Sequence, residues 1–161
     1  MLKLFNFNKK KLTLLAPFSG EIVPLTDVPD DVFSSKMLGD GIALAPQSAS
    51  VCAPAAGKIV QVAPTLHAIG LQAKGIDLLL HLGIDTVNLE GTGFQCAVAA
   101  GDTVKAGEQL MTVDWEQIKP RVPSIITPLV VTNMDAVAEI EVVAIGGRVE
   151  VGDELLSLTL N

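Results

Sequence analysis

In the run Ile76–Leu82, one strand face would carry Leu78, Leu80 and Leu82 and the other would carry Asp77, Leu79 and His81, which is the pattern of a half-buried strand. A second apolar run precedes it, and the turn signal Lys74-Gly75 between the two predicts a hairpin. With the turn centred on Lys74, residues whose numbers sum to about 148 face each other, so His67 lies opposite His81. Directly paired residues have Cβ atoms about 5 Å apart. The alternation therefore predicts that the two histidines of the chain form one site. If the turn were one residue longer or shorter, the two rings would lie diagonally on opposite faces, or a bulge would be needed to realign them.

Two short patterns recur along the chain. The segment Ala16–Val23 returns at Ala53–Val60, and Gly101–Leu110 returns at Gly146–Leu155. Each is a turn followed by a strand. Many short strands with Gly and Pro turns predict an all-β fold, an antiparallel β-sandwich or barrel-sandwich with internal pseudo-symmetry. We expect a single domain at residues 12–161, preceded by a basic, flexible leader at residues 1–11.

Only a few short helical turns are expected between the strands. Asp30 is the predicted N-cap of a helix that Gly39 ends, and Asp114 is the predicted N-cap of one that Pro120 ends. A third single turn is expected at Asn133–Val137.

Charge and cysteine content narrow the possible partners. The chain has 18 acidic and 11 basic residues, a net charge of −7, which argues against nucleic acid. Cys52 and Cys96 lack metal-ligand spacing and indicate buried thiols in a cytoplasmic protein. No apolar run approaches the roughly 20 residues of a membrane span. The leader carries four lysines among apolar residues, which fits either a solvated, disordered segment or contact with an anionic membrane.

Two paired histidines support more than one kind of chemistry. A neutral imidazole can attack a phosphoryl group, and a second imidazole, held by the Thr65 hydroxyl, can stabilise the charge that develops. With Asp85, the two histidines could instead ligate a hydrolytic zinc, although the sequence has no HExxH or HxH motif. The simplest alternative is that each histidine is satisfied by a backbone carbonyl at a sheet edge.

Two further patterns are incomplete. No glycine-rich motif with a Walker lysine is present, so we expect the phosphoryl donor to be another protein rather than ATP. Twin glycine-turn-strand units also occur in lipoyl and biotinyl carrier domains, but the residues around Lys74 do not match their modified lysine.

Seven motifs follow one another from about residue 12 to the C-terminal part of the chain. They are Ala16–Ile22, Asp27–Asp30 with Val32-Phe33, Met37–Ala43, Thr65–Ala68, His81–Val87, Gly91–Phe94 and Thr127–Asp135. In these residues the chain resembles the glucose-family enzyme IIA component of the bacterial phosphoenolpyruvate-dependent sugar phosphotransferase system. The resemblance implies an antiparallel β-sandwich with a shallow active-site depression and no bound cofactor.

The resemblance also implies roles for particular residues. His81 would accept the phosphoryl group from phospho-HPr on Nε2 and pass it to a cysteine of enzyme IIB during sugar uptake. His67 would stabilise the phosphoryl group, Thr65 would orient His67, and the carbonyl of Gly83 would hold His81.

A partner-binding surface is implied in the same way. Its apolar rim would comprise Val32, Phe33, Leu38 and Leu79, and its acidic groups would be Asp30, Asp85 and Asp135. The same face could serve a purely regulatory binding module that docks on permeases or kinases, with an intermolecular zinc at His67 and His81 and no intrinsic metal. The N-terminal Met and the short segment after the last strand favour a free-standing protein.

Two departures from the family pattern stand out. Asp77 occupies a position where the family suggests Glu, and residues 123–126 replace a more usual Lys-Ser-Thr run. We expect neither to touch the predicted chemistry.

Overall fold

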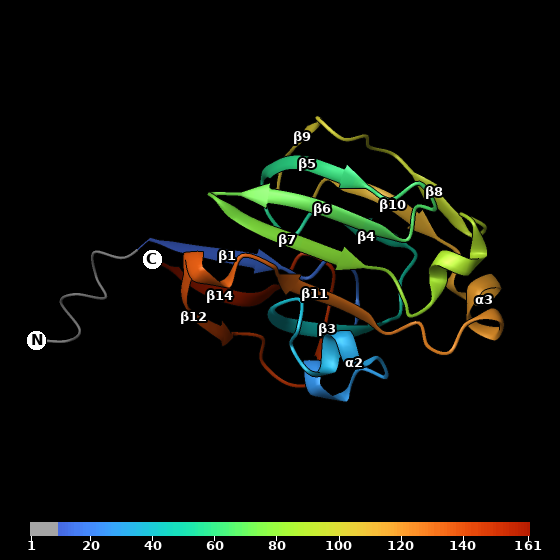
Figure 1. The fold of residues 1–161 in the computed structure, drawn as a ribbon, viewed down its shortest axis with the longest axis horizontal. Helices are drawn as coiled ribbons and strands as arrows, with labels where there is room; N and C mark the ends of the chain where they lie inside the picture. Colours follow the sequence, from blue (N-terminus) through green and yellow to red (C-terminus); the bar gives the residue numbers. More distant parts are fainter. Residues whose placement is uncertain (1–9) are drawn as a thin grey trace, which may run out of the picture.

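Antiparallel strands are the main regular structure of residues 10–161, the part of the chain that the computed structural model describes (Figure 1). The largest sheet has eight strands in the order β13-β2-β3-β11-β7-β6-β5-β9. In that order they are β13 (Arg148–Val149), β2 (Gly20–Val23), β3 (Asp40–Pro46), β11 (Thr127–Val131), β7 (Ile76–His81), β6 (Ala68–Ala73), β5 (Gly57–Val62) and β9 (Thr103–Val104).

Two three-stranded sheets complete the β-structure. One is β1 (Lys11–Leu15), β14 (Glu154–Leu160) and β12 (Val137–Val142), and the other is β4 (Ser50–Cys52), β10 (Gln109–Val113) and β8 (Phe94–Cys96). All the strand pairs within these sheets are antiparallel, so the predicted all-β sandwich is confirmed.

Short helices connect the strands. They are η1 (Leu25–Asp27), α2 (Asp31–Ser34), η2 (Thr86–Leu89), α3 (Trp115–Ile118), η3 (Lys119–Arg121) and η4 (Met134–Ala136). Asp30 and Asp114 cap α2 and α3 as predicted, each accepting a backbone N–H with its carboxylate. One predicted end is wrong, because α2 stops at Ser34, before Lys36 turns left-handed at φ 61°. The other is confirmed, because α3 ends before Pro120; the chain then continues through Pro120 in the 3-10 turn η3, since proline is tolerated in a first helical turn.

The repeats form a pseudo-symmetric pair. The pairing of Gly20 with Val149 recurs as Gly57 with Val104, and that of Leu15 with Glu154 recurs as Cys52 with Gln109. The two copies also bond to each other reciprocally, Leu15 N–H to the Pro54 carbonyl (2.8 Å) and Cys52 N–H to the Pro17 carbonyl (2.7 Å). The internal pseudo-symmetry predicted from the sequence is confirmed.

All three sheets bury their apolar side chains in one shared core, and a smaller cluster lies apart from it. The smaller cluster comprises Leu25, Val28, Phe33, Ala43, Ile84 and Val130. It joins η1 and α2 to β3, β11 and the loop after β7, and Figure 1 shows α2 beside β3. Burial of these side chains therefore fixes the short helices next to the end of β7.

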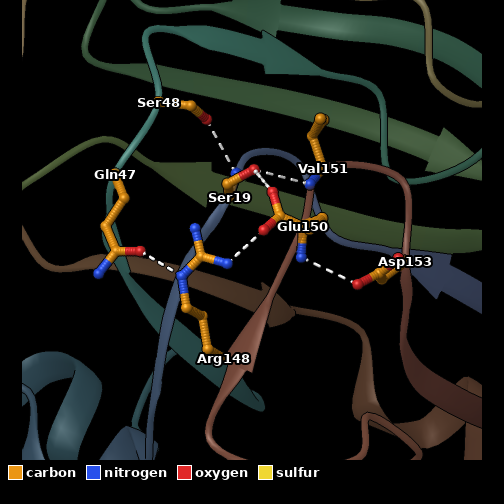
Figure 2. A network of polar contacts seen from close by, with 7 residues as sticks. All are labelled: Ser19, Gln47, Ser48, Arg148, Glu150, Val151 and Asp153. Carbon is orange, nitrogen blue, oxygen red and sulfur yellow. Dashed lines mark hydrogen bonds and ion pairs between the residues drawn. The ribbon is translucent and has the colours of Figure 1, made fainter.

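A polar network secures the short strand β13 (Figure 2). Arg148 bonds the Gln47 side chain through Nε (2.7 Å) and forms an ion pair with Glu150. The Ser19 hydroxyl donates to Glu150 Oε2 (2.9 Å) and accepts from Val151 N–H (3.0 Å). Hydrogen bonding to Arg148 lowers the pKa of the Glu150 carboxyl. The network holds residues that are far apart in the sequence without contributing to the core.

β1 begins at Lys11, the last residue of the predicted leader. Residues 1–9, and with them the predicted flexible leader and its membrane contact, lie outside the described residues. Within residues 10–161, no helix has both the length and the apolar character needed to cross a bilayer.

Candidate functional site

His81 is the last residue of β7, at a point where that strand leaves the sheet. Leu80 pairs with Leu129 of β11, so continuing the same register would place Pro128 opposite His81. Proline has no N–H to donate to a sheet ladder. The pairing of β7 with β11 ends there, and the chain is free to turn immediately after His81.

The turn after His81 carries a backbone acceptor back to the imidazole. Gly83 has φ 77°, in the left-handed region, and its carbonyl oxygen lies 2.8 Å from His81 Nδ1. A carbonyl oxygen can only accept, so Nδ1 carries the proton of the neutral ring. The lone pair therefore resides on Nε2, which is the nitrogen available to attack an electrophile or bind a metal.

His67 meets His81, but not through the predicted strand register. The turn of the β6–β7 hairpin contains both Lys74 (φ 50°) and Gly75 (φ 77°), and Ala68, not His67, is paired with His81. The prediction of direct opposition was wrong by one residue. The rings still lie 5.1 Å apart between centroids, at 78° to each other, because His67 precedes β6.

Residues before β6 set the position of His67. Leu66 adopts φ 64°, and the His67 carbonyl accepts the N–H of Leu82 at 2.7 Å, which joins the segment of His67 to the turn after His81. The Thr65 hydroxyl lies 2.6 Å from His67 Nδ1. The predicted contact between Thr65 and His67 is present.

Burial keeps both imidazoles neutral near pH 7. Burial lowers the pKa of His67, and the neighbouring His81 lowers it further. Burial also lowers the pKa of His81, partly opposed by the hydrogen bond to Gly83 and by the negative charges of Asp30 and Asp85. Each ring therefore has a free lone pair over a wider pH range than an exposed histidine.

Phe33 lies beneath the site rather than on its rim. Its side chain is only 4% exposed, and its ring centroid is 5.0 Å from that of His81. The expectation that Phe33 is an exposed part of the docking rim is not met, because its side chain fills the smaller apolar cluster. Phe33 is thus a packing partner of the imidazole.

The other predicted rim residues remain accessible. Val32 and Leu38 are exposed, and Leu79 is half-buried on the same face of β7 as His81. Met37, which the sequence reasoning did not assign to the rim, is 76% exposed beside Leu38. Three of the four predicted rim residues are therefore at least partly accessible, together with Met37.

The predicted acidic residues separate into two groups. Asp30 and Asp85 are near enough to His81 for their negative charges to oppose the lowering of its pKa by burial. Asp135 lies in η4, next to Asn133, whose side chain bonds the backbone of Gly75 and Asp77 at the opposite end of β7. The structure does not bring Asp135 to the histidines, and its contact with partners stays a prediction.

The zinc-hydrolase alternative lacks a ligand set. No group of three or more His, Cys, Asp and Glu side chains in residues 10–161 is placed to hold a metal ion. Asp85 therefore does not complete a site with His67 and His81. The intermolecular zinc, which would take ligands from a partner, stays a prediction.

Sequence reasoning missed three residues around the turn. Thr127 and Thr86 bond its backbone with buried hydroxyls, and the Ser124 carbonyl accepts the N–H of Ile84 at 2.9 Å. The backbone carbonyl of Ser124 contacts the loop that carries Gly83, and the expectation that residues 123–126 do not touch the chemistry stays a prediction. Thr127 and Ser124 are far from the turn in the sequence, so no local signal could have found them, whereas Thr86 lies within the motif His81–Val87.

Comparisons with known proteins identify the family of the chain. Residues 12–137 match the model of the phosphoenolpyruvate-dependent sugar phosphotransferase system, EIIA 1 family. The solved structure of glucose permease IIA from Mycoplasma capricolum superposes with a TM-score of 0.87 at 44% identity, covering 94% of this chain and 97% of that one.

Curated relatives include both short and long proteins. The glucose-specific EIIA component of Halalkalibacterium halodurans is 44% identical over 86% of each chain, and that of Staphylococcus aureus strain COL is 39% identical over 99% of this chain and 98% of its own. The glucoside-specific EIICBA component of Staphylococcus carnosus is 48% identical over 89% of this chain, which spans only 20% of that protein. The resemblance seen in the sequence motifs is confirmed, and the chain belongs to the EIIA 1 family of the phosphoenolpyruvate-dependent sugar phosphotransferase system.

Proposed function

We propose that this chain is a phosphocarrier in which His81 accepts a phosphoryl group from phospho-HPr and passes it to a cysteine of enzyme IIB during sugar uptake. The observation that carries the proposal is the hydrogen bond from His81 Nδ1 to the Gly83 carbonyl, which leaves the lone pair on Nε2. The bond from Nε2 to phosphorus forms as the bond from phosphorus to the donor breaks, and the Nδ1 proton stays in place. In onward transfer the cysteine thiolate attacks phosphorus and Nε2 is the leaving group.

His67 is proposed to stabilise the phosphoryl group. If the Thr65 hydroxyl donates to His67 Nδ1, the proton of the neutral ring is on Nε2, which can then donate to a phosphoryl oxygen. The short distance between the two rings supports this role. A hydrogen-bond donor aimed at developing negative charge is worth most in a partly buried site.

The surface around the histidines is suited to protein partners. We assign Val32, Met37, Leu38 and Leu79 as an apolar contact strip for HPr and enzyme IIB, with Asp30 and Asp85 as acidic groups that would attract basic residues of either partner. Asp135 would provide a further acidic contact, farther from the histidines, for basic residues of the same partners. Relatives named EIICBA components support a functional connection with IIB and IIC units, and we place the exchange in the cytoplasm.

The proposal is tested by intact mass spectrometry after incubation with phosphoenolpyruvate, enzyme I and HPr. Wild type is expected to gain one acid-labile phosphate and His81→Ala none. His67→Ala is expected to gain the phosphate and to pass it poorly to enzyme IIB. Absence of phosphate on wild type would overturn the proposal and favour the regulatory binding module that the sequence left open.

A further inference from the structure

We propose that Thr127 and Thr86 are positioning residues that clamp the two ends of one peptide group, Leu82–Gly83, and so aim the Gly83 carbonyl at His81 Nδ1. The inference rests on the proposed function for its effect on phosphoryl transfer, but its geometric part concerns the unphosphorylated protein. Neither threonine hydrogen-bonds the imidazole, and both hydroxyls bond the backbone.

Thr127 holds the N–H end of this peptide. The Gly83 N–H donates to Thr127 Oγ1 at 3.2 Å, and that hydroxyl donates in turn to the Ile125 carbonyl at 3.1 Å. The donating capacity of the hydroxyl is used by Ile125, so its role toward Gly83 is that of an acceptor. Because Thr127 begins β11 and is 1% exposed, water cannot replace it without opening the sheet.

Thr86 holds the C=O end of the same peptide. Its hydroxyl donates to the Leu82 carbonyl at 2.7 Å, and its side chain is 0% exposed. Its methyl group also packs against Gly83, where an added Cβ would lie 2.7 Å from Thr86 Cγ2. The peptide is therefore fixed at both ends and packed on one side.

The next peptide, Gly83–Ile84, carries the acceptor of His81. Its N–H donates to the Ser124 carbonyl at 2.9 Å, and its carbonyl accepts from His81 Nδ1 at 2.8 Å. An uncompensated change in φ of Gly83, which the clamped N–H resists, would turn this carbonyl away from the ring. The two hydroxyls, together with the Ser124 carbonyl, thereby keep the proton on one imidazole nitrogen.

Isosteric variants separate positioning from packing. Thr127→Val and Thr86→Val remove a hydroxyl at constant volume, and Thr127→Ser and Thr86→Ser keep it. Thr159→Val, in the buried strand β14 of another sheet, is the matched control. The tautomer of His81 is measured by long-range 15N–1H NMR of the unphosphorylated protein, and the rate of phosphoryl uptake from phospho-HPr by rapid quench.

We expect wild type, both serine variants and Thr159→Val to show one tautomer, protonated on Nδ1. In Thr127→Val and Thr86→Val the Nε2-protonated form should appear, and uptake should fall by about tenfold to a hundredfold, because a displacement of about 1 Å in a reacting group can cost the larger factor. Wild-type tautomer and rate in both valine variants would overturn the proposal.

Two results distinguish failure of the clamp from failure of the proposed function. If wild type takes up no phosphate but the valine variants still shift the tautomer, the clamp holds and the phosphocarrier proposal fails. If the valine variants do not fold, hydrogen exchange of the Gly83 amide in wild type tests the bond from that amide to Thr127. Strong protection supports the bond to Thr127, and exchange as fast as that of an exposed loop amide overturns it.

Discussion

The ring of Phe33 packs on the ring of His81, with centroids 5.0 Å apart and planes inclined by 55°. Phe33 belongs to the smaller apolar cluster under α2, so this helix contributes to the environment of the imidazole without bonding to it. The arrangement excludes water from one side of His81 and is one source of the burial that lowers its pKa.

Removing the Phe33 ring is expected to raise the pKa of His81 toward its ordinary value, because the charged imidazolium would regain solvent. Phe33→Ala should show this shift in an NMR titration of the imidazole, with a loss of about 3 kcal/mol in the free energy of unfolding from the cavity. Phe33→Leu, which keeps the site apolar, should retain most of the pKa lowering. An unchanged pKa in Phe33→Ala would show that Phe33 does not desolvate His81.

Phosphoryl uptake is expected to persist at pH values below the ordinary histidine pKa of 6.5. Attack requires the unprotonated Nε2, and the folded protein holds the pKa of His81 below that value, so protonation becomes limiting only in more acidic solution. Rapid-quench rates over a pH series, at saturating phospho-HPr, measure the midpoint. A midpoint above 6.5 would contradict the lowered pKa.

The Thr65 hydroxyl is expected to matter more for onward transfer than for uptake. Thr65→Val removes the hydroxyl that lies 2.6 Å from His67 Nδ1. The proton of the His67 ring can then move from Nε2 to Nδ1, and the ring loses its hydrogen-bond donor toward the phosphoryl group. Transfer to enzyme IIB should slow by about tenfold, within the range seen for loss of a charge-stabilising donor. Thr65→Ser should restore it, and equal rates in all three proteins would remove Thr65 from the mechanism.

Met37 is expected to contribute to partner binding. Met37→Lys replaces an exposed apolar side chain with a charge that repels a basic partner, and should raise KM for phospho-HPr by about tenfold with little change in kcat. Ile145→Lys is the matched control, since Ile145 is 95% exposed in the loop between β12 and β13. A comparable increase in both variants would indicate an effect of net charge rather than contact.

Local features of the sequence predicted local structure well. Asp30 and Asp114 lie directly before the residues whose N–H groups they accept, and a cap needs only a few neighbouring residues. The alternation in β7 also held, because one face of that strand packs in the core. The internal repeats predicted the pseudo-symmetric strand pairs for the same reason, since each copy contains its own turn and strand.

Features that depend on distant residues could not be predicted. The hairpin register was off by one because Lys74 and Gly75 both occupy the turn, and the histidines still meet only because His67 lies outside β6. Phe33 was placed on the rim by the family resemblance, yet the side chains of several strands bury it. Thr127 is 44 residues from Gly83, so its hydroxyl has no detectable relation to the site until the sheet is formed.

Identifying the nitrogen atom that carries the phosphate tests the proposed role of His81 most directly. We would phosphorylate 15N-labelled protein through HPr and measure 31P–15N coupling in the histidine rings. We expect coupling of phosphorus to Nε2 of His81, with Nδ1 still protonated and His67 unmodified. Phosphate on Nδ1 of His81, or on His67, would contradict the role assigned to the Gly83 carbonyl.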